Sequence, residues 1–256
     1  MPTLNGIGRV SIQIAESARA MGELAASSIA EEIRRKLRLQ ARVRIVFAAA
    51  PSQAEMLHAL ARAEDVDWSR VDAFHMDEYI GLERAAEQLF GEWLRREFFS
   101  HVSLGKVNLI DTSTPPERSA GEYAALLAEA PLDIVCLGIG MNGHIAFNDP
   151  PANFEETRDV YVVELDSLSR AQQVEEKLFT RIDDVPTHAI TLSIPRLLRA
   201  DKLFCCVPGS FKREAVAKAF LGPVDPFCPA SILSQRADCA VYLDRDSASG
   251  LAPESQ

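Results

Sequence analysis

Short apolar segments alternate with longer amphipathic segments along the whole chain. The apolar segments are rich in β-branched residues, and they predict strands over residues 43–50, 71–75, 107–110, 133–138, 189–194, 202–207 and 240–243. Between them, apolar positions recur at helical spacing and predict helices over residues 14–40, 54–63, 87–99, 118–130 and 210–220. This alternation predicts an α/β fold with a single doubly wound, mostly parallel, Rossmann-like sheet and helices on both faces.

The domain organisation follows from the absence of breaks in this pattern. No stretch of Pro, Gly or Ser is long enough to be a linker, so we expect one domain over residues 1–245 and a disordered tail over residues 246–256. The segment 150–184 is the least regular part of the domain. A lid over a site and a surface for oligomer contacts would both fit it.

Charge and cysteine content narrow the class of protein. The 27 Lys and Arg residues against 37 Asp and Glu give a formal charge of −10 without a basic run, which argues against a nucleic-acid partner. No segment approaches the roughly 20 apolar residues of a membrane span, and the N-terminal residues do not resemble a signal peptide. The five cysteines contain no CxxC pair, so they predict reduced thiols in a cytoplasmic protein.

Polar residues follow four of the predicted strands directly. These junctions carry Ser52-Gln53, Asp77-Glu78, the stretch from Gly138 to His144, and Ser210 to Lys212. In open α/β sheets, ligands bind beyond the carboxyl ends of the strands. We therefore expect all four junctions at one edge of the sheet, around a ligand.

The segment GIGMNGHIAFNDP, residues 138–150, is the most glycine-rich of the four. Its glycines permit tight turns close to a ligand, but it matches neither GxGxxG nor a Walker loop, so a nucleotide fingerprint is absent. His144 is either a functional residue of this loop or a structural histidine.

The polar residues of the other three junctions each have a functional and a structural interpretation. Asp77 is a candidate general base at the end of a strand, or it is part of a helix cap or a solvated acidic loop. Two further helices are expected to begin at Ser52-Gln53 and at Ser210 to Lys212. Their first backbone amides, with the ammonium of Lys212, are suited to bind an anion. Alternatively, both serines are simple N-caps.

Together, the strings FHMDEYIGL, GHIAFNDP and VPGSFK resemble the glucosamine-6-phosphate deaminase family, within the wider group that also contains 6-phosphogluconolactonases. The similarity runs from about residue 43 to residue 243. The lactonase branch typically has GHTAS at the histidine, where this chain has GHIAF, so the resemblance favours the deaminase branch.

The resemblance implies a role for each matching position. Asp77 matches the base that moves a proton between C2 and C1 of the open-chain amino sugar, and His144 matches the group that opens the pyranose ring. Lys212 and the loop of Ser52 and Gln53 match phosphate-binding positions. The positions whose backbone contacts the sugar are matched by Gly138 and Ala146.

No metal or organic cofactor is expected, because the chemistry that the resemblance implies requires none. The five histidines agree with this expectation, since they show no HxH or HExxH spacing.

The chain departs from the family pattern around the histidine and at the phosphate loop. Asn142 and Asp149 stand where an Asp and a Glu are usual, so we expect Asp149 alone to supply the carboxylate that pairs with His144. The loop AAAPSQ has fewer glycines than is common, so the side chains of Ser52 and Gln53 are expected to replace part of the backbone cradle. An arginine that helps to bind phosphate falls between residues 170 and 177, in a register that the sequence leaves unassigned.

The expected function is therefore the conversion of glucosamine-6-phosphate to fructose-6-phosphate and ammonium, with a small-molecule sugar phosphate as the partner. The sequence leaves three alternatives open: the same chemistry on another sugar phosphate such as galactosamine-6-phosphate, lactone hydrolysis, and non-catalytic sugar-phosphate sensing. It also permits a small homo-oligomer.

Overall fold

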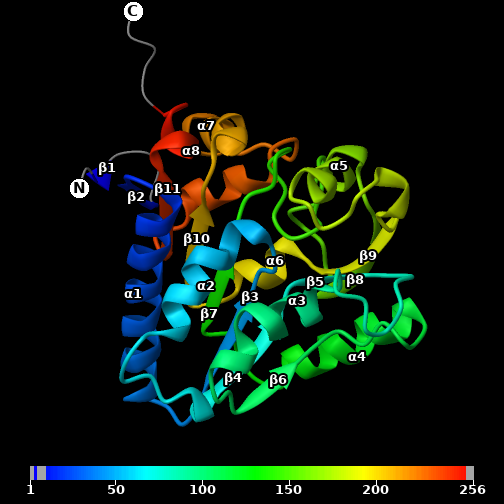
Figure 1. Cartoon of the computed structure of the whole chain (residues 1–256), viewed down its shortest axis with the longest axis horizontal. Coiled ribbons are helices and arrows are strands. Elements are labelled where there is room, and N and C mark those ends of the chain that lie inside the picture. The colour runs from blue at the N-terminus through cyan, green and yellow to red at the C-terminus, as the bar shows by residue number, and fades with distance from the viewer. Residues whose placement is uncertain (1–2, 5–9, 252–256) are drawn as a thin grey trace, which may run out of the picture.

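The fold is built on a twisted parallel sheet that crosses the whole molecule (Figure 1). The structure is a computed structural model and describes residues 3–4 and 10–251. The eight strands lie in the order β1-β2-β11-β10-β7-β3-β4-β6, and only β1 runs antiparallel to its neighbour. Their bounds are β1 Thr3–Leu4, β2 Ser11–Ala15, β3 Val43–Phe47, β4 Val71–His75, β6 Lys106–Asn108, β7 Ile134–Leu137, β10 Lys202–Val207 and β11 Cys239–Asp244.

A second, smaller sheet lies beside the main one, on the right of Figure 1. It is antiparallel, in the order β5-β9-β8, with β5 at Asp77–Tyr79, β8 at Val160–Glu164 and β9 at His188–Leu192. The α/β class and the mostly parallel main sheet are confirmed, whereas the expectation of a single sheet is wrong. The strand expected over residues 189–194 belongs to the small sheet and ends before Ile194, which begins α6.

Helices cover both faces of the main sheet, as the sequence predicted. Alternate residues of each central strand face opposite layers: Ile45 and Phe47 pack under α1 and α2, while Val46 packs with the core on the other side. The helices are α1 Ala18–Leu37, α2 Ala54–Ala61, α3 Phe90–Glu97, α4 Pro116–Ala128, α5 Ser167–Glu175, α6 Ile194–Leu198, α7 Arg213–Leu221 and α8 Arg245–Ala248.

Two expected element boundaries near the ends of the chain are wrong. Residue 14 does not start a helix, because Ile14 lies in β2 and pairs with β11; α1 begins after Ser17, whose side chain accepts a hydrogen bond from the Ala20 amide. The expected tail begins instead with α8, and Leu251 beyond it is buried in the core. The remainder of that tail, residues 252–256, lies outside the described residues.

The sheet order sets where a ligand can bind. From β3 the chain proceeds to β4 and β6 on one side, and from β7 it proceeds to β10 and β11 on the other. The strand order therefore reverses between β3 and β7, and such a switch point leaves a crevice beyond the carboxyl ends of the two strands.

Phe47, the last residue of β3, offers a test of the core beneath that crevice. Its ring is fully buried and lies 5.2 Å from the Phe98 ring and 5.9 Å from the Phe99 ring. We expect Phe47→Ala to lower the free energy of unfolding by about 3–5 kcal/mol in urea denaturation, because it leaves a cavity that the sheet cannot close. Leu39→Ala, at a side chain that is 73% exposed, should change it by less than about 0.5 kcal/mol. Equal losses in the two variants would contradict this account of the core.

Candidate functional site

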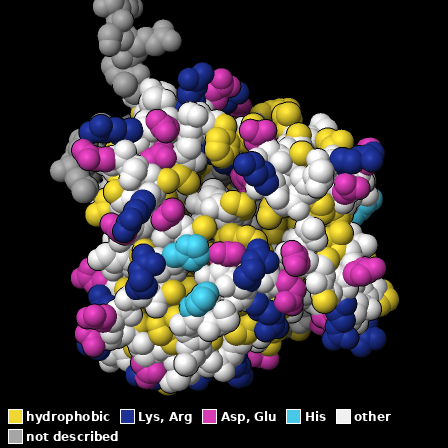
Figure 2. All heavy atoms as spheres, viewed as in Figure 1, with side chains coloured by type: hydrophobic (Ala, Val, Ile, Leu, Met, Phe, Trp, Pro, Cys, Tyr) yellow, Lys and Arg dark blue, Asp and Glu magenta, His cyan; other side chains and the backbone are white. Residues whose placement is uncertain are grey.

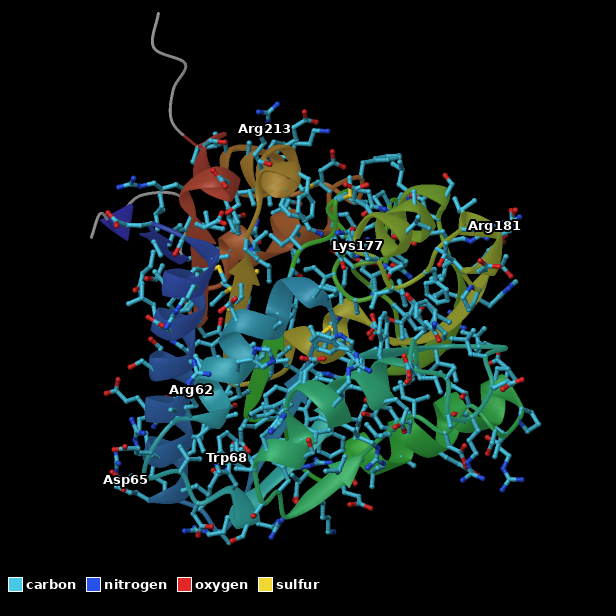
Figure 3. All side chains as sticks on the ribbon, in the orientation of Figure 1. Arg62, Asp65, Trp68, Lys177, Arg181 and Arg213 are labelled. Carbon is cyan, nitrogen blue, oxygen red and sulfur yellow. The ribbon has the colours of Figure 1, made fainter. Side chains whose placement is uncertain are left out.

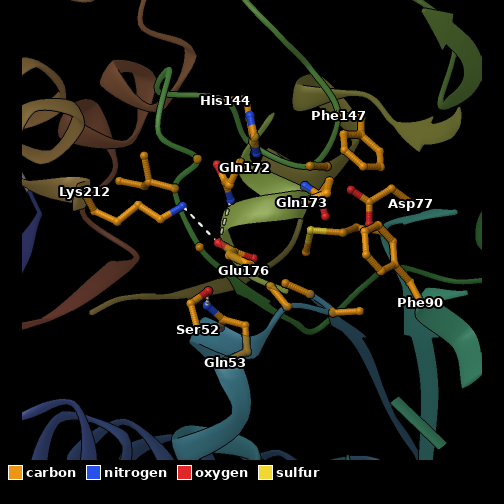
Figure 4. A pocket seen from close by; sticks show the side chains of 18 residues that line it. Ser52, Gln53, Asp77, Phe90, His144, Phe147, Gln172, Gln173, Glu176 and Lys212 are labelled. Atoms are coloured by element: carbon orange, nitrogen blue, oxygen red, sulfur yellow. Dashed lines mark hydrogen bonds and ion pairs between the residues drawn. The ribbon is translucent and has the colours of Figure 1, made fainter. Parts of the chain in front are cut away.

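The four polar junctions meet in one cleft, as expected from the sequence. The strands that precede them, β10, β7, β3 and β4, are neighbours in the sheet and run in the same direction. Their carboxyl ends therefore open on the same edge. The cleft is lined by residues from all four junctions, from α3 and from the carboxyl-terminal part of α5, shown in Figure 4: Ala48, Ala49, Ala50, Ser52, Gln53, Met76, Asp77, Phe90, Gly138, Ile139, Gly140, His144, Ala146, Phe147, Gln172, Gln173, Glu176 and Lys212.

Two glycines shape the loop that carries His144. A Cβ atom on Gly140 would lie 2.2 Å from Cε1 of the His144 ring, so only glycine lets the imidazole lie against this backbone. Gly143 has a φ of 87°, a conformation that glycine adopts without strain. Ala146 also has a positive φ, 49°, and lines the cleft together with Gly138. The backbone of this loop thus lies at the edge of the sheet where a ligand is expected from the sequence.

A hydrogen-bonded network fixes one edge of the His144 ring. Nδ1 of His144 lies 2.8 Å from the hydroxyl of Ser169 and 3.2 Å from Oδ1 of Asp149, and the Ser169 hydroxyl also donates to that Asp149 oxygen. With Asp149 ionised, the consistent arrangement has Nδ1–H donating to Ser169. Nε2 is then the ring nitrogen available to a ligand.

Asp149 is the carboxylate of this network. Burial alone would raise the pKa of Asp149, but the hydrogen bond and charge of His144, with hydrogen bonds from Ser169 and Asn142, outweigh burial and hold it below its usual value. Among the described residues, Asp149 is the one carboxylate within ion-pair distance of His144. Geometrically this is the pairing that we expected from the sequence.

Asn142 supports the network without contacting the imidazole. Its Nδ2 donates to Oδ1 of Asp149 at 3.0 Å and to Oδ2 of Asp166 at 3.1 Å, while its Oδ1 accepts from the backbone amide of His144 at 3.0 Å. A neutral amide here can bridge two carboxylates, which a third carboxylate could not do without protonation. Asn142 therefore orients Asp149 and the histidine loop.

Asp77 faces the cleft from the first residue of β5, next to Phe90 and Phe147 (Figure 4). It is 6% exposed, and its position is fixed by pairing with Thr191 of β9. Burial, reinforced by the negative charges of Glu78 and Asp149, raises the pKa of Asp77 well above its usual value. A carboxylate whose proton affinity is raised in this way is suited to accept a proton from a weak carbon acid.

Glu78 holds the wall of the cleft in place. The next residue after Asp77 is 3% exposed, and its carboxylate accepts hydrogen bonds from the backbone amides of Tyr79, Phe90 and Gly91. Those amides include the first turn of α3, so Glu78 ties that helix to β5. The two neighbouring carboxylates thus differ in position: Asp77 lines the cleft, and Glu78 binds the backbone behind the cleft wall.

Ser52 and Gln53 lie in a 3-10 turn, Pro51–Gln53, that leads into α2. The Gln53 side chain is 1% exposed, and its Nε2 donates to the Cys206 carbonyl of β10 at 3.0 Å, while its Oε1 is buried without a partner among the described residues. Gln53 therefore supports the loop from within the sheet edge. Neither Ser52 nor Ser210 caps a helix through its side chain, which removes the simple N-cap interpretation of both serines.

Lys212 supplies the positive charge of the cleft. It ends the 3-10 turn Ser210–Lys212 before α7, and its side chain is 2% exposed. Burial lowers the pKa of Lys212, against the opposing effect of the Glu176 carboxylate, whose Oε1 lies 3.5 Å from Nζ. Among the described residues that line the cleft, Lys212 is the only Lys or Arg.

The segment expected to carry an arginine for an anion brings none into the cleft. Arg170 turns away, and its guanidinium donates to the carbonyls of Ile182 and Val185. Lys177 and Arg181 are exposed on the surface (Figure 3). Glu176 is the charged residue of this segment that lines the cleft.

Helix α5 is the part of the site that the sequence did not identify. Within the segment left open as a lid or an oligomer surface, Ser169, Gln172, Gln173 and Glu176 follow the spacing i, i+3, i+4 and i+7, so they share one helix face. All but Ser169 line the cleft, and Ser169 binds His144. The usable signal was the set of three uncharged polar residues on that face, Ser169, Gln172 and Gln173.

In residues 3–4 and 10–251, no three His, Cys, Asp or Glu side chains gather closely enough to hold a metal ion. Of the helices described, none combines the length and apolar character that a bilayer crossing needs. On the face shown in Figure 2, basic and acidic side chains are interspersed without a continuous basic area.

The sequence of this chain is similar to that of a known family of sugar-phosphate enzymes. The family model described as glucosamine-6-phosphate isomerases/6-phosphogluconolactonase matches residues 16–242. A glucosamine-6-phosphate deaminase of Listeria welshimeri is 34% identical over 228 residues, which are 89% of this chain and 96% of that protein. The corresponding protein of Corynebacterium glutamicum is 33% identical over 192 residues, 74% of each chain.

Solved structures show the same fold. A monomeric glucosamine-6-phosphate deaminase superposes with a TM-score of 0.86 and 26% identity, covering 93% of this chain and 99% of that one. A 6-phosphogluconolactonase of Thermotoga maritima gives a TM-score of 0.75 at 18% identity, covering 91% and 98% of the two chains, and this similarity concerns the fold alone.

Glu78 gives a test of the electrostatics of the cleft wall. Burial raises its pKa to about 7 against three opposing amide hydrogen bonds. Because the folded state holds this proton more tightly than the unfolded state, the stabilisation is complete below about pH 4.5 and is lost as pH rises through about 7. Glu78→Gln should therefore flatten the decline of the free energy of unfolding between pH 5 and pH 8, measured by urea denaturation, whereas Glu83→Gln on the exposed loop should not. An unchanged slope in Glu78→Gln would contradict the assignment.

Proposed function

This chain belongs to the family of glucosamine-6-phosphate isomerases and 6-phosphogluconolactonases, and we propose that it is a glucosamine-6-phosphate deaminase, which converts glucosamine-6-phosphate to fructose-6-phosphate and ammonium. The observation that carries the proposal is the meeting of Asp77, His144 and Lys212 in one cleft, in a chain that aligns with 96% of the Listeria welshimeri deaminase. Such an enzyme acts in amino-sugar catabolism, including the use of N-acetylglucosamine after deacetylation.

His144 would open the sugar ring. Its Nδ1 is held by Ser169 and Asp149, so Nε2 can take the proton of the anomeric hydroxyl and return a proton to the ring oxygen. The Asp149 carboxylate stabilises the imidazolium formed between these two transfers. The product is the open-chain aldehyde, whose C2 proton is acidified by the neighbouring carbonyl.

Asp77 would then move a proton from C2 to C1. Removal of the C2 proton gives an enolamine, and reprotonation at C1 gives the imine of the ketose. Water adds to this imine and ammonia leaves, so one water is consumed and the net reaction is a hydrolytic deamination. The raised pKa of Asp77 matches this task, because the acid formed after the first transfer must hold its proton until C1 accepts it.

Lys212 and the turn of Ser52 would bind the phosphate at the other side of the cleft from Asp77 (Figure 4). Anchoring the phosphate converts the proton transfers into reactions within one bound complex. Gly138 and Ala146 would contact the sugar through their backbones, and Gln53 would support the turn. No cofactor enters this scheme, and all five cysteines are buried free thiols, as is usual for proteins of the cytoplasm.

The first test is ammonium release by the purified protein, with and without Asp77. We expect release from glucosamine-6-phosphate, little from free glucosamine, and a fall in kcat of about 10²- to 10⁴-fold in Asp77→Asn, because the amide cannot accept the C2 proton. Asp183→Asn, at a side chain that is 74% exposed, is the matched control and should retain full activity.

Galactosamine-6-phosphate and a phosphogluconolactone complete the substrate panel. Faster ammonium release from galactosamine-6-phosphate than from glucosamine-6-phosphate would identify the former as the substrate of the same reaction. Lactone hydrolysis that survives in Asp77→Asn, without ammonium release from any amino sugar, would overturn the proposed function.

The pH dependence of kcat/KM tests the charge of Asp149. Asp149 is one of the groups that raise the pKa of Asp77, so Asp149→Asn should lower that pKa and move the acidic limb of the profile to lower pH. Ser169→Ala removes the hydrogen bond to His144 but keeps the charge, so it should lower kcat and leave the acidic limb in place. A profile between pH 5 and pH 9 that is identical in shape for Asp149→Asn and the unmodified enzyme would rule out this coupling.

A further inference from the structure

The position beside Lys212 is taken by a carboxylate of the protein itself. Oε1 of Glu176 lies 3.5 Å from Nζ of Lys212, and the two side chains are 5% and 2% exposed (Figure 4). Gln172, one turn earlier in α5, donates from Nε2 to the same Glu176 oxygen at 2.8 Å. An anion that binds Lys212 therefore meets a buried negative charge already in place.

The Glu176 carboxylate is only half satisfied in this position. Its second oxygen, Oε2, is buried without a hydrogen-bond partner among the described residues. An ionised carboxylate normally accepts several hydrogen bonds when it is buried, and each missing bond is unfavourable. The carboxylate is held through one oxygen only, by Lys212 and Gln172, so a better ligand of Lys212 can displace it.

The local helix structure does not favour a negative charge at this point either. Glu176 is the C-cap residue of α5, where the helix dipole favours cations over anions. The next residue, Lys177, has a φ of 63°, in the left-handed region that non-glycine residues adopt at a cost. Lys212 and the Gln172 amide are thus the two groups that hold the Glu176 carboxylate in the cleft, and Lys212 is the charged one.

A phosphate dianion that binds in the cleft also needs the ammonium of Lys212. Phosphate oxygens accept hydrogen bonds and seek cations, yet the described cleft offers one ammonium and, within reach of it, a carboxylate. Two like charges a few ångströms apart repel strongly in a partly buried site. The phosphate and Glu176 therefore compete for Lys212, because binding both at close range is electrostatically unfavourable.

We propose that Glu176 is a specificity-determining residue that competes with the substrate phosphate for Lys212 and so sets a low affinity for phosphate-bearing ligands. The inference rests on the proposed function in one respect, namely that the phosphate binds at Lys212. A phosphorylated ligand then binds only when the carboxyl-terminal turn of α5 withdraws Glu176. The withdrawal lowers the affinity for ligand without altering Asp77 or His144.

The test compares Glu176→Gln with Glu175→Gln, its neighbour on the same helix, which is exposed and does not line the cleft. Both changes remove one negative charge from α5, but only the first removes it from Lys212. We expect Glu176→Gln to bind inorganic phosphate about tenfold more tightly in titration calorimetry, the factor that corresponds to 1.4 kcal/mol. KM for glucosamine-6-phosphate should fall by a similar factor with kcat little changed, and Glu175→Gln should match the unmodified protein.

A second variant keeps the test decisive if Glu176→Gln folds poorly, since breaking a buried ion pair destabilises proteins. Glu176→Asp retains the charge on a stem one methylene shorter, which loosens the contact with Lys212. It should tighten phosphate binding by a smaller factor. In both variants, phosphate should raise the melting temperature more than it does in the unmodified protein.

The outcomes separate this inference from the proposed function. Tighter phosphate binding in Glu176→Gln without ammonium release from any variant would support the role of Glu176 and reject the deaminase assignment. Ammonium release with phosphate binding in Glu176→Gln equal to or weaker than in the unmodified protein and Glu175→Gln would overturn the role of Glu176 and leave the deaminase assignment standing.

Discussion

The parallel alignment of four neighbouring strands is the constraint on which the site depends. Because β10, β7, β3 and β4 run in the same direction, every residue that follows one of them emerges at the same edge of the sheet. Asp77, His144 and Lys212 are far apart in the sequence and meet only for this reason. The register of the strands, fixed by their buried apolar side chains, thereby fixes the relative positions of the charged groups.

The cleft concentrates negative charge in a chain that is already acidic. Asp77, Asp149 and Glu176 lie in or beside it, with Glu78 behind the wall, and Lys212 is the single ammonium among the described residues that line it. Each carboxylate is accommodated differently: Asp149 by hydrogen bonds, Glu78 by backbone amides, Glu176 by Lys212. Burial is the main cause of the raised pKa of Asp77, and the negative charges of Glu78 and Asp149 add to it.

Around the histidine, hydrogen bonds from two separate elements fix the orientation of the imidazole. Asn142 bridges Asp149 and Asp166 through its amide and also holds the backbone of His144. Ser169, from a different element, completes the contact between His144 and Asp149. The orientation of the imidazole thus depends on a loop and a helix together, so their packing is as important as the identity of the residues in the loop.

Apolar periodicity and position after a strand are local properties, so they were sufficient to predict the α/β class, the strands β4 and β10 to the residue, and the residues that line the cleft at the strand ends. The tertiary structure was needed to reveal the second sheet, since β5 and β9 pair across more than one hundred residues and β5 has only three. It also decided that α5 closes the cleft and that Glu176, rather than a cation, reaches Lys212. Such contacts depend on how a helix packs against distant loops, and the polar face of α5 does not by itself indicate which loops it meets.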